Sequence, residues 1–431
     1  MIPEGWAVRT FGETADYKSG RTPARANEGY WSESADGVPW ISIADMVPFG
    51  TVTRTKERIT RVAFDEVFQS TAVRAGTLIM SYKLTIGRVA TLGVDACHNE
   101  AIIAIYPRPG VDQRYLGYFL AQVDYDALQD RQVKGNTLNR DKIDRIEILL
   151  PPLDEQVSIA DVLDLVKRSI TLQDRTQATL QELKRAAMQA LFTRGLRREA
   201  QKETEIGPIP ESWSLTPVAQ LGSVKGGKRM PKGVSLVQEN TGRPYIRVSD
   251  LGDNSVRPDG VLFVPRGYEA AIRRYRISAA DVYISIAGTI GLTGQVPICL
   301  DDANLTENAA RLVIQPGDVI ARYVMYALAG RACQQQIARA TAKNAQPKLA
   351  LTRIEQILVP LPPTAAEQRE VVAILDGIAA KIDLHRRKRA VLDELFKTLL
   401  HKLMTGEIRV ADVDLAMVNE HAQPTPIEAG V

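Results

Sequence analysis

The residues of this chain best suited to chemistry are lysines, arginines and asparagines in glycine-containing loops. One such loop runs from Lys18 to Pro23, and a related one runs from Lys225 to Lys232. Another runs from Lys134 to Arg140, with a counterpart from Lys343 to Lys348. Lysine and arginine side chains suit phosphate oxygens, whereas asparagine and arginine suit the edges of bases. The loops therefore make DNA the favoured ligand.

A third pair of loops consists of residues 82–85 and 286–289, although the second copy lacks the basic residue. A solvated turn would explain any single loop equally well. Because the loops occur as pairs in the two halves of one chain, their pattern favours DNA binding. The candidate DNA-contacting residues are Lys18, Ser19, Arg21, Thr22, Tyr82, Lys83, Thr85, Lys134, Asn136, Asn139, Arg140, Lys225, Lys228, Arg229, Lys232, Lys343, Asn344 and Lys348.

Patterns for catalysis or metal binding are weak. The spacing Gly-x4-Gly-Lys begins at Gly222, but Arg229 stands where a phosphate-binding loop needs Ser or Thr, and Pro231 opposes the helix that should follow. Cys97 and His98 are adjacent, yet no second pair completes a metal site, which favours a structural role for both. We therefore predict a non-enzymatic chain with no catalytic residue, no metal site and no cofactor of its own.

The loops are paired because the chain contains an internal repeat, with an offset near 205 to 212 residues. The repeated motifs are Ile2-Pro3-Glu4-Gly5-Trp6 with Ile209-Pro210-Glu211-Ser212-Trp213, Trp40-Ile41 with Tyr245-Ile246, Asp45 with Asp250, Thr85-Ile86-Gly87 with Thr289-Ile290-Gly291, and Asn99 with Asn308. Each half reads as a head rich in short strands, bounded by Gly, Pro and Asn, followed by one long helix. Residues 115–129 and 323–338 are predicted helices within the heads.

The two long helices are predicted from about 154 to 193 and from about 366 to 405, each opening with Glu-Gln. Neither contains an internal proline, and their apolar residues recur at intervals of three and four. At 1.5 Å per residue each helix would be about 60 Å long. A narrow apolar stripe needs a partner helix, so we expect the two to pair antiparallel. The predicted seam residues are Ile159, Val162, Val166, Leu180, Leu183, Val371, Ile374, Ile378, Leu392 and Leu395.

Polar residues interrupt both stripes near their centres. An antiparallel pairing would place the two polar centres opposite each other, which would fix the register of the pair. Ordinary solvated positions in an imperfect coil explain the pattern equally well. The interrupting residues are Gln173, Thr176 and Gln177 in the first helix and His385, Lys388 and Arg389 in the second.

Composition places the 431-residue chain among ordinary globular proteins of two or three domains. Residues 207–362 carry 18 Lys and Arg against 12 Asp and Glu, whereas residues 1–150 carry 18 against 19. The second head is therefore distinctly basic, which suits a polyanion. Three scattered cysteines and no signal-like or membrane-spanning run lead us to expect a cytoplasmic protein without disulfides.

The expected fold class is α+β, with two strand-rich mixed domains joined by two long antiparallel helices in a pseudo-two-fold repeat. We expect a charged linker after the first long helix and a disordered tail at the end. The expected divisions are residues 1–150 for the first head, 151–206 for the first long helix and linker, 207–362 for the second head, 363–410 for the second long helix, and 411–431 for the tail.

These motifs, in this order and repeated twice, resemble those of the specificity subunits of type I restriction–modification systems. The resemblance covers both halves, although Lys228-Arg229-Met230 departs from the Gly-x-Thr-Pro pattern of the first half. The residues that carry it are Ser19-Gly20 with Thr22-Pro23, Trp40-Ile41 with Asp45, Thr85-Ile86-Gly87, Asn99-Glu100-Ala101, and the Pro-Pro and Glu-Gln pairs that introduce each long helix.

The resemblance implies that each head is a target recognition domain that reads one half of a split DNA sequence. The helices would act as spacer and would dock two methyltransferase subunits, joined by motor-nuclease subunits. S-adenosylmethionine, ATP and Mg would be held by these partners, and no membrane would be involved. The alternatives are a coiled-coil adaptor that does not bind DNA, and a specificity subunit of a methylation-only defence complex.

If the helices act as a ruler, a longer helix should change the spacing of the two half-sites. We predict that inserting four residues near Gln173, which adds about 6 Å of helix, lengthens the unread gap by one or two base pairs. Sequencing of modified bases in host DNA would measure the gap. An unchanged gap in the methylated motif would contradict the hypothesis that helix length sets the spacing of the half-sites.

Overall fold

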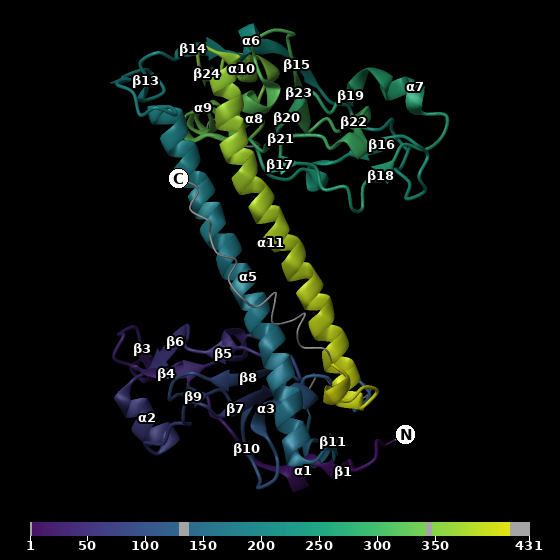
Figure 1. Cartoon of the computed structure of the whole chain (residues 1–431). Helices are drawn as coiled ribbons and strands as arrows, with labels where there is room; N and C mark the ends of the chain where they lie inside the picture. The colour runs from purple at the N-terminus through teal and green to yellow at the C-terminus, as the bar shows by residue number, and fades with distance from the viewer. Residues whose placement is uncertain (1, 129–137, 342–346, 414–431) are drawn as a thin grey trace. The chain divides into compact units, whose positions relative to one another are not determined.

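A computed structural model describes the chain at residues 2–128, 138–341 and 347–413. The chain forms two compact units, of which one contains residues 1–175 and 386–431 and the other residues 176–385. Each unit consists of one head and one half of each long helix, and these elements are labelled in Figure 1. In the described part of the chain, no helix has the length and apolar character needed to cross a membrane.

The first head is built on two sheets. Its strands are β1 (Ala7–Thr10), β2 (Ala15–Ser19), β3 (Trp31–Ser32), β4 (Val38–Ile41), β5 (Thr51–Val52), β6 (Glu57–Ile59), β7 (Leu78–Ser81), β8 (Val89–Leu92), β9 (Cys97–His98), β10 (Ile102–Pro107) and β11 (Glu147–Leu150). A five-stranded sheet has the order β2-β10-β7-β8-β5, and a four-stranded sheet has the order β3-β6-β4-β9. The remaining strands, β1 and β11, pair antiparallel with each other.

The second head repeats this design. Its strands are β14 (Ser214–Pro217), β15 (Gly222–Gly226), β16 (Pro244–Ile246), β17 (Asn254–Ser255), β18 (Leu262–Phe263), β19 (Arg276–Ile277), β20 (Val282–Ser285), β21 (Thr293–Gln295), β22 (Ala303–Leu305), β23 (Ala309–Ile314) and β24 (Leu358–Leu361). The five-stranded sheet β15-β23-β20-β21-β17 and the pair β14-β24 match their counterparts strand for strand. The four-stranded sheet, β18-β16-β22-β19, keeps one parallel pair, which is central here (β16-β22) but lies at the end of the sheet in the first head (β4-β9). The duplication expected from the sequence is confirmed.

The strand register corrects one part of the predicted alignment. Ile103 pairs with Ser19 and Ala310 pairs with Gly226, so both strands are offset by 207 residues (310 − 103 and 226 − 19). This offset makes Thr306, not Asn308, the counterpart of Asn99. The asparagines are chemically alike, but they lie two residues apart in the register.

The shorter helices also differ from the predictions. They are α1 (Phe11–Thr14), α2 (Arg61–Phe68), α3 (Gln113–Leu120), α4 (Arg140–Asp144), α6 (Val218–Leu221), α7 (Glu269–Ile272), α8 (Ala321–Ala329), α9 (Arg331–Thr341) and α10 (Leu351–Glu355). The helix predicted to extend to residue 129 ends at Leu120, and the Asp124 carboxylate then accepts hydrogen bonds from the backbone N–H groups of Asp126 and Ala127. Such local bonds compete with a helix. Its counterpart is divided at Gly330, whose backbone is extended.

The two long helices are confirmed within about a residue of their predicted ends. They are α5 (Leu153–Arg194) and α11 (Ala365–Thr405). Acidic residues occupy the first turn of each and basic residues the last turn, which complements the helix dipole. Each helix is followed by a glycine with a positive φ, namely Gly195 and Gly406. Glycine is the common terminator because it adopts this left-handed conformation without steric cost.

The Glu-Gln pairs fix each head on its long helix. The Trp6 indole donates to Glu155 and the Trp213 indole donates to Glu367, both at 3.0 Å. The next residue of each helix is buried, and its amide oxygen accepts a backbone N–H at the start of a head helix. Gln156 accepts from Asp112 and Gln368 accepts from Ile320, both at 2.8 Å.

About two turns further along, the Leu-Asp motifs add a second set of anchors. Asp164 accepts hydrogen bonds from Tyr118 and from Arg114, which lie on α3. The corresponding Asp376 accepts from Tyr326 at 2.6 Å and from Arg322 at 2.7 Å, which lie on α8. These carboxylates therefore hold α3 and α8 against the long helices.

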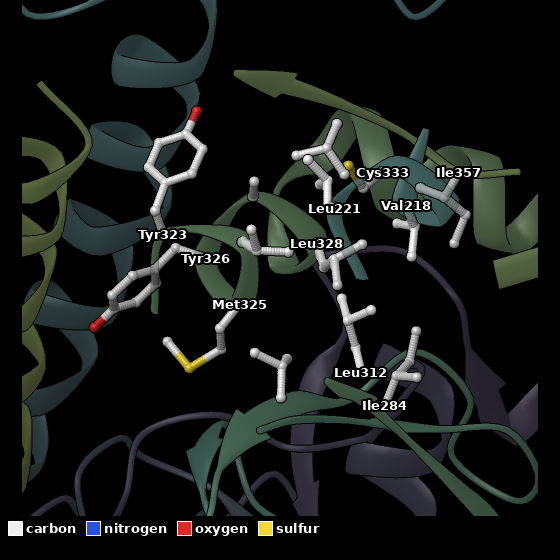
Figure 2. Close-up of a cluster of buried hydrophobic side chains, with 14 of the residues drawn as sticks. Val218, Leu221, Ile284, Leu312, Tyr323, Met325, Tyr326, Leu328, Cys333 and Ile357 are labelled. Atoms are coloured by element: carbon white, nitrogen blue, oxygen red, sulfur yellow. The ribbon is translucent and has the colours of Figure 1, made fainter. Parts of the chain in front are cut away.

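A large apolar core lies beneath these anchors in each unit. In the unit containing the second head it includes Met188 and Phe192 of α5, Val371 and Leu375 of α11, and the whole buried face of α8. Figure 2 shows the rings of Tyr323 and Tyr326 on one side of this core and the aliphatic side chains on the other. The Tyr323 hydroxyl is fully buried and donates to the Pro360 carbonyl at 2.6 Å. The ring can thus be buried without an unpaired hydroxyl.

The residues predicted for the seam differ in burial. Ile159, Val162, Val166, Val371 and Leu392 are buried, and Leu180, Ile378 and Leu395 are half-buried.

Leu183 and Ile374 were predicted on the seam wrongly, because their exposed fractions are 51% and 44%. Lys184 and Leu375 are buried instead of these two residues. Each helix packs on its head as well as on the other helix, so the buried stripe is wider and turned toward the head. A spacing rule for a two-helix seam does not include this second surface.

The polar centres contribute at least one ion pair between the helices. Asp174 of α5 lies 3.1 Å from Arg389 of α11, and Gln173 is buried. At the other end of the same unit, Glu155 receives two hydrogen bonds from Arg409, which follows α11. These two pairs show that the helices run antiparallel in this unit. The Asp174–Arg389 pair also favours the interpretation that the polar centres fix the register of the two helices over the interpretation that they are only solvated.

The segments after the long helices pack back onto the heads. Strand β12 (Gln201–Lys202) pairs with β13 (Ile209–Pro210), so the expected linker contains ordered structure. After α11, a 3-10 turn (η6, Val410–Asp412) occupies the start of the expected tail. Residues 414–431 lie outside the described residues.

The adjacent residues Ile374 and Leu375 test the corrected seam. We predict that Leu375→Ala lowers the free energy of unfolding by about 2–5 kcal/mol, because it leaves a cavity in a fully buried site. Ile374→Ala should change it by about 0.5 kcal/mol or less. Urea unfolding of the two variants measures both effects. Equal losses of the free energy of unfolding would support the original prediction that Ile374 lies on the seam.

Candidate nucleic-acid interface

Two loops of the first head leave the same edge of the five-stranded sheet, where β10 begins, and the described end of a third is bonded to one of them. Loop A (residues 20–25) starts with the Gly20 N–H bonded to the Ile102 carbonyl at 3.1 Å. Loop B (residues 82–87) starts with the Tyr82 N–H bonded to the Ala101 carbonyl at 2.9 Å. The described end of loop C (residues 138–140) is tied to loop B, because the Leu138 N–H donates to the Tyr82 carbonyl at 3.0 Å. The loops predicted from the sequence therefore converge.

The second head brings its three loops together with the same backbone bonds. Loop A′ (residues 227–232) begins with Gly227, which donates to Ala309 at 2.9 Å. Loop B′ (residues 286–291) begins with Ile286, which donates to Asn308 at 2.8 Å. In the described end of loop C′ (residues 347–350), Leu349 donates to Ile286 at 2.9 Å. We call the sheet edge that carries these loops the loop edge of each head.

Loops A and A′ approach the neighbouring strand so closely that only glycine fits at their start. A Cβ on Gly20 would lie 1.9 Å from the His98 carbonyl oxygen, and one on Gly227 would lie 2.0 Å from that of Thr306. Gly227 therefore preserves the backbone of Gly20, although the residues after it depart from the pattern of the first half. The departure changes the side chains of the loop and leaves its path intact.

An aromatic side chain holds the next residue of each loop. Arg21 donates its N–H to His98 at 2.9 Å, and its carbonyl accepts from the Trp40 indole at 3.0 Å. In the second head, the Lys228 carbonyl accepts from the Tyr245 hydroxyl at 2.8 Å. The Trp40 and Tyr245 rings are buried, while the Arg21 and Lys228 side chains are exposed. A fixed backbone therefore presents a solvent-exposed cation at the same place in both heads.

A glutamate lies between loops A and B of each head. Glu100 accepts a hydrogen bond from the Thr22 hydroxyl, and Glu307 forms an ion pair with Arg229 at 2.6 Å. Burial raises the pKa of the Glu307 carboxyl, but the bonds from Arg229 and Thr306 outweigh burial, so its pKa lies below the usual value. Both side chains can orient their loop A partner or accept a hydrogen bond from a base.

Loops B and B′ are closed by a buried serine. The Ser81 hydroxyl donates to the Thr85 carbonyl, and the Ser285 hydroxyl donates to the Thr289 carbonyl at 2.5 Å. Gly87 and Gly291 return their N–H groups to the same two serines at 2.9 and 3.0 Å. The repeated Thr-Ile-Gly motif therefore specifies a tight loop whose tip faces solvent.

The structure places most of the predicted contact residues at the loop edges. Lys18 and Ser19 end β2, Lys225 lies on β15, and the other described candidates lie on the six loops. The Asn139 side chain caps α4 by accepting the Lys142 N–H at 2.9 Å, so one of its polar atoms has a structural role. The candidates outside the described residues are Lys134, Asn136, Lys343 and Asn344.

Two arginines missed by the sequence prediction extend the loop edge of the second head. Arg273 and Arg274 are exposed on a 3-10 turn (η4, Arg273–Tyr275), and the Lys228 ammonium lies 5.9 Å from the Tyr275 ring centre. The first head has helix α2 before the corresponding strand, and this helix exposes the acidic residues Asp65 and Glu66 instead of arginines. The Val67 carbonyl of α2 accepts a hydrogen bond from the Arg21 side chain. Adjacent arginines in the most basic segment were the signal available in the sequence.

The residues tested for other chemistry lie in structural positions. Cys97 and His98 are buried on β9, where burial raises the pKa of the Cys97 thiol to about 12 and lowers the pKa of His98. The glycine-rich stretch that begins at Gly222 is strand β15, not a phosphate-binding loop. Within the described ranges, no group of three or more His, Cys, Asp or Glu side chains could hold a metal ion.

The aromatic anchors can be tested one head at a time. We predict that Trp40→Phe costs about 1 kcal/mol of stability, because the Arg21 carbonyl loses its donor in a partly buried site. Trypsin should then cleave after Arg21 faster than in the wild type, while cleavage after Lys228 is unchanged. Tyr245→Phe should produce the reverse pattern. Equal acceleration at both sites would show general unfolding instead of local release.

Comparison with known proteins gives a consistent result. A family model described as the type I restriction modification DNA specificity domain matches residues 3–182 and again residues 210–394. The MjaVIII specificity subunit of a type I restriction enzyme from Methanocaldococcus jannaschii is 23% identical over 429 residues, which are 96% of this chain and 95% of that protein. The putative MjaX specificity subunit of the same organism is 24% identical over 445 residues, with 95% of each covered.

Solved structures show the same fold. A type I restriction-modification S subunit from M. genitalium matches with a TM-score of 0.58 and 15% identity, over 93% of this chain and 96% of that one. A chain from a type I system studied for complex assembly and conformational transition matches with a TM-score of 0.57 and 17% identity, over 95% and 100%. The family model covers both heads and most of both long helices. The chain belongs to the family of type I restriction modification DNA specificity domains.

Proposed function

We propose that this chain is the non-catalytic, DNA-reading subunit of a type I restriction–modification complex, and that each head reads one half of a bipartite target. The observation that carries the proposal is the repeated loop edge, where the same backbone frame presents exposed Lys and Arg side chains in both heads. Membership of the specificity-domain family supports it. A coiled-coil adaptor would have no need for two matched sets of glycine-anchored cationic loops.

The geometry suits recognition by fixed loops. The backbone of loops A and B is held by carbonyls of the head and by buried Trp40, Tyr245, Ser81 and Ser285. Loops that are ordered before binding lose less conformational entropy on a duplex. Their Lys and Arg side chains would neutralise phosphates, and their Asn, Thr and Glu side chains would contact base edges.

The long helices supply surface for protein partners. Leu183, Ile374, Leu384 and Val391 are apolar residues of α5 and α11 with exposed fractions between 44% and 67%. We propose that such residues help to dock two methyltransferase subunits, which motor-nuclease subunits join. S-adenosylmethionine, ATP and Mg would be held by those partners. The solved type I complex assembly with a chain of this fold supports the proposal.

Arg273 and Arg274 provide a direct test of DNA contact by the second head. We predict that Arg273→Ala/Arg274→Ala weakens duplex binding and lowers the slope of log K against log salt by up to about 2, because each lost phosphate contact contributes about 0.9. The assay is a salt titration of duplex binding by the chain co-expressed with its methyltransferase subunits.

The matched control is Arg197→Ala/Arg198→Ala. These adjacent, exposed arginines lie on the segment between α5 and β13, so the change in net charge is the same but no loop edge is altered. The control should leave the slope unchanged. Duplex binding that does not depend on salt in the wild type would favour the adaptor instead.

A further inference from the structure

Leu84, at the tip of loop B, combines two features that are individually unusual. Its side chain is 72% exposed, and its backbone is left-handed with φ of 65°. A bulky residue rarely adopts this conformation because its Cβ approaches the neighbouring carbonyl. The counterpart in loop B′ is Gly288, with φ of 74°, which needs no such strain.

The surrounding contacts prevent the tip of loop B from relaxing. On one side the Tyr82 carbonyl accepts from Leu138, and on the other the Ser81 hydroxyl donates to Thr85. Gly87 closes the loop against the Tyr125 ring, which a Cβ at Gly87 would approach within 2.3 Å. The left-handed backbone of Leu84 is therefore imposed by the loop frame, as it is at Gly288.

Neither the fold nor solubility gains from leucine at this position. Its side chain is not part of an apolar core of the first head, and glycine at the same place in the second head satisfies the loop. An exposed leucine with a strained backbone carries both a hydration cost and a conformational cost. Strained residues of this kind mark functional sites when the surrounding structure fixes them.

We propose that Leu84 reads a thymine in the first half-site by apolar contact with its 5-methyl group. The proposal rests on the DNA-reading function of the loop edge, from which loop B extends. Its neighbours Lys83 and Thr85 can bond to phosphate or base edges, but a leucine side chain cannot. The apolar group that a duplex exposes in its major groove is the thymine methyl. The second head, with glycine here, lacks this contact.

The first arm of the test uses Leu84→Gly, which copies the second head. In the complex with the methyltransferase subunits, the variant should melt at or above the wild-type temperature, because the strain is removed. Its affinity for the cognate duplex should fall roughly three- to tenfold, about the effect of one buried methyl contact. The methylated motif should become degenerate at one T·A pair of the first half-site and stay unchanged in the second.

The second arm identifies the methyl group itself. Each thymine of the first half-site is replaced in turn by deoxyuridine, which lacks only the methyl. At one position the wild type should lose affinity by the same factor as the variant, and the variant should lose nothing more. Val8→Ala, which trims an exposed apolar residue on β1 away from the loop edge, should match the wild type in every assay.

Three results would overturn the proposal. An unchanged motif and affinity in Leu84→Gly would show that the side chain reads nothing. A loss of affinity without any deoxyuridine effect in the wild type would show that Leu84 contacts something other than a thymine methyl. Equal degeneracy in both half-sites would indicate general loosening. If the wild-type complex methylates no bipartite motif, the proposed function of the chain fails instead.

Discussion

Everything in this structure depends on the hydrogen bonds that attach each head to the start of a long helix. A tryptophan donates to Glu155 or Glu367, and the following glutamine, Gln156 or Gln368, accepts from the head. Because these groups are half-buried or buried, breaking them would leave polar atoms without partners. Loops that must meet a duplex at fixed positions need heads that cannot pivot on their helices.

The two heads share the same loop backbone but carry different side chains on it. Glycine at the start of loop A, a buried serine under loop B and an aromatic donor behind loop A recur at matching positions. The side chains carried by that frame differ, since Thr22 is replaced by Arg229 and Leu84 by Gly288. Two halves with one backbone can therefore prefer different sequences, and the basic second head can contribute more of the phosphate attraction.

The sequence was sufficient to predict the repeat, the sheet-rich heads, the limits of both long helices and the positions of loops A and B in both heads. It was insufficient where a residue meets two surfaces at once. Ile374 fits a two-helix seam, but the head turns the buried face toward Leu375. Arg273 gave no periodic signal, and only the contact between Tyr275 and Lys228 brings it beside a loop. Asn99 and Asn308 matched by type, while strand register makes Thr306 the true counterpart.

The two units differ at the point where each head contacts the long helix of the other half. In the unit of the first head, Phe49 packs on Tyr118 and on Phe396 of α11. At the matching place in the other unit, Asp253 pairs with the buried Lys184 of α5 at 2.8 Å. A head transferred alone would leave Lys184 facing an aromatic ring, and a buried unpaired ammonium is costly. A head is therefore matched to the segment of the opposite helix that it contacts as well as to its own helix.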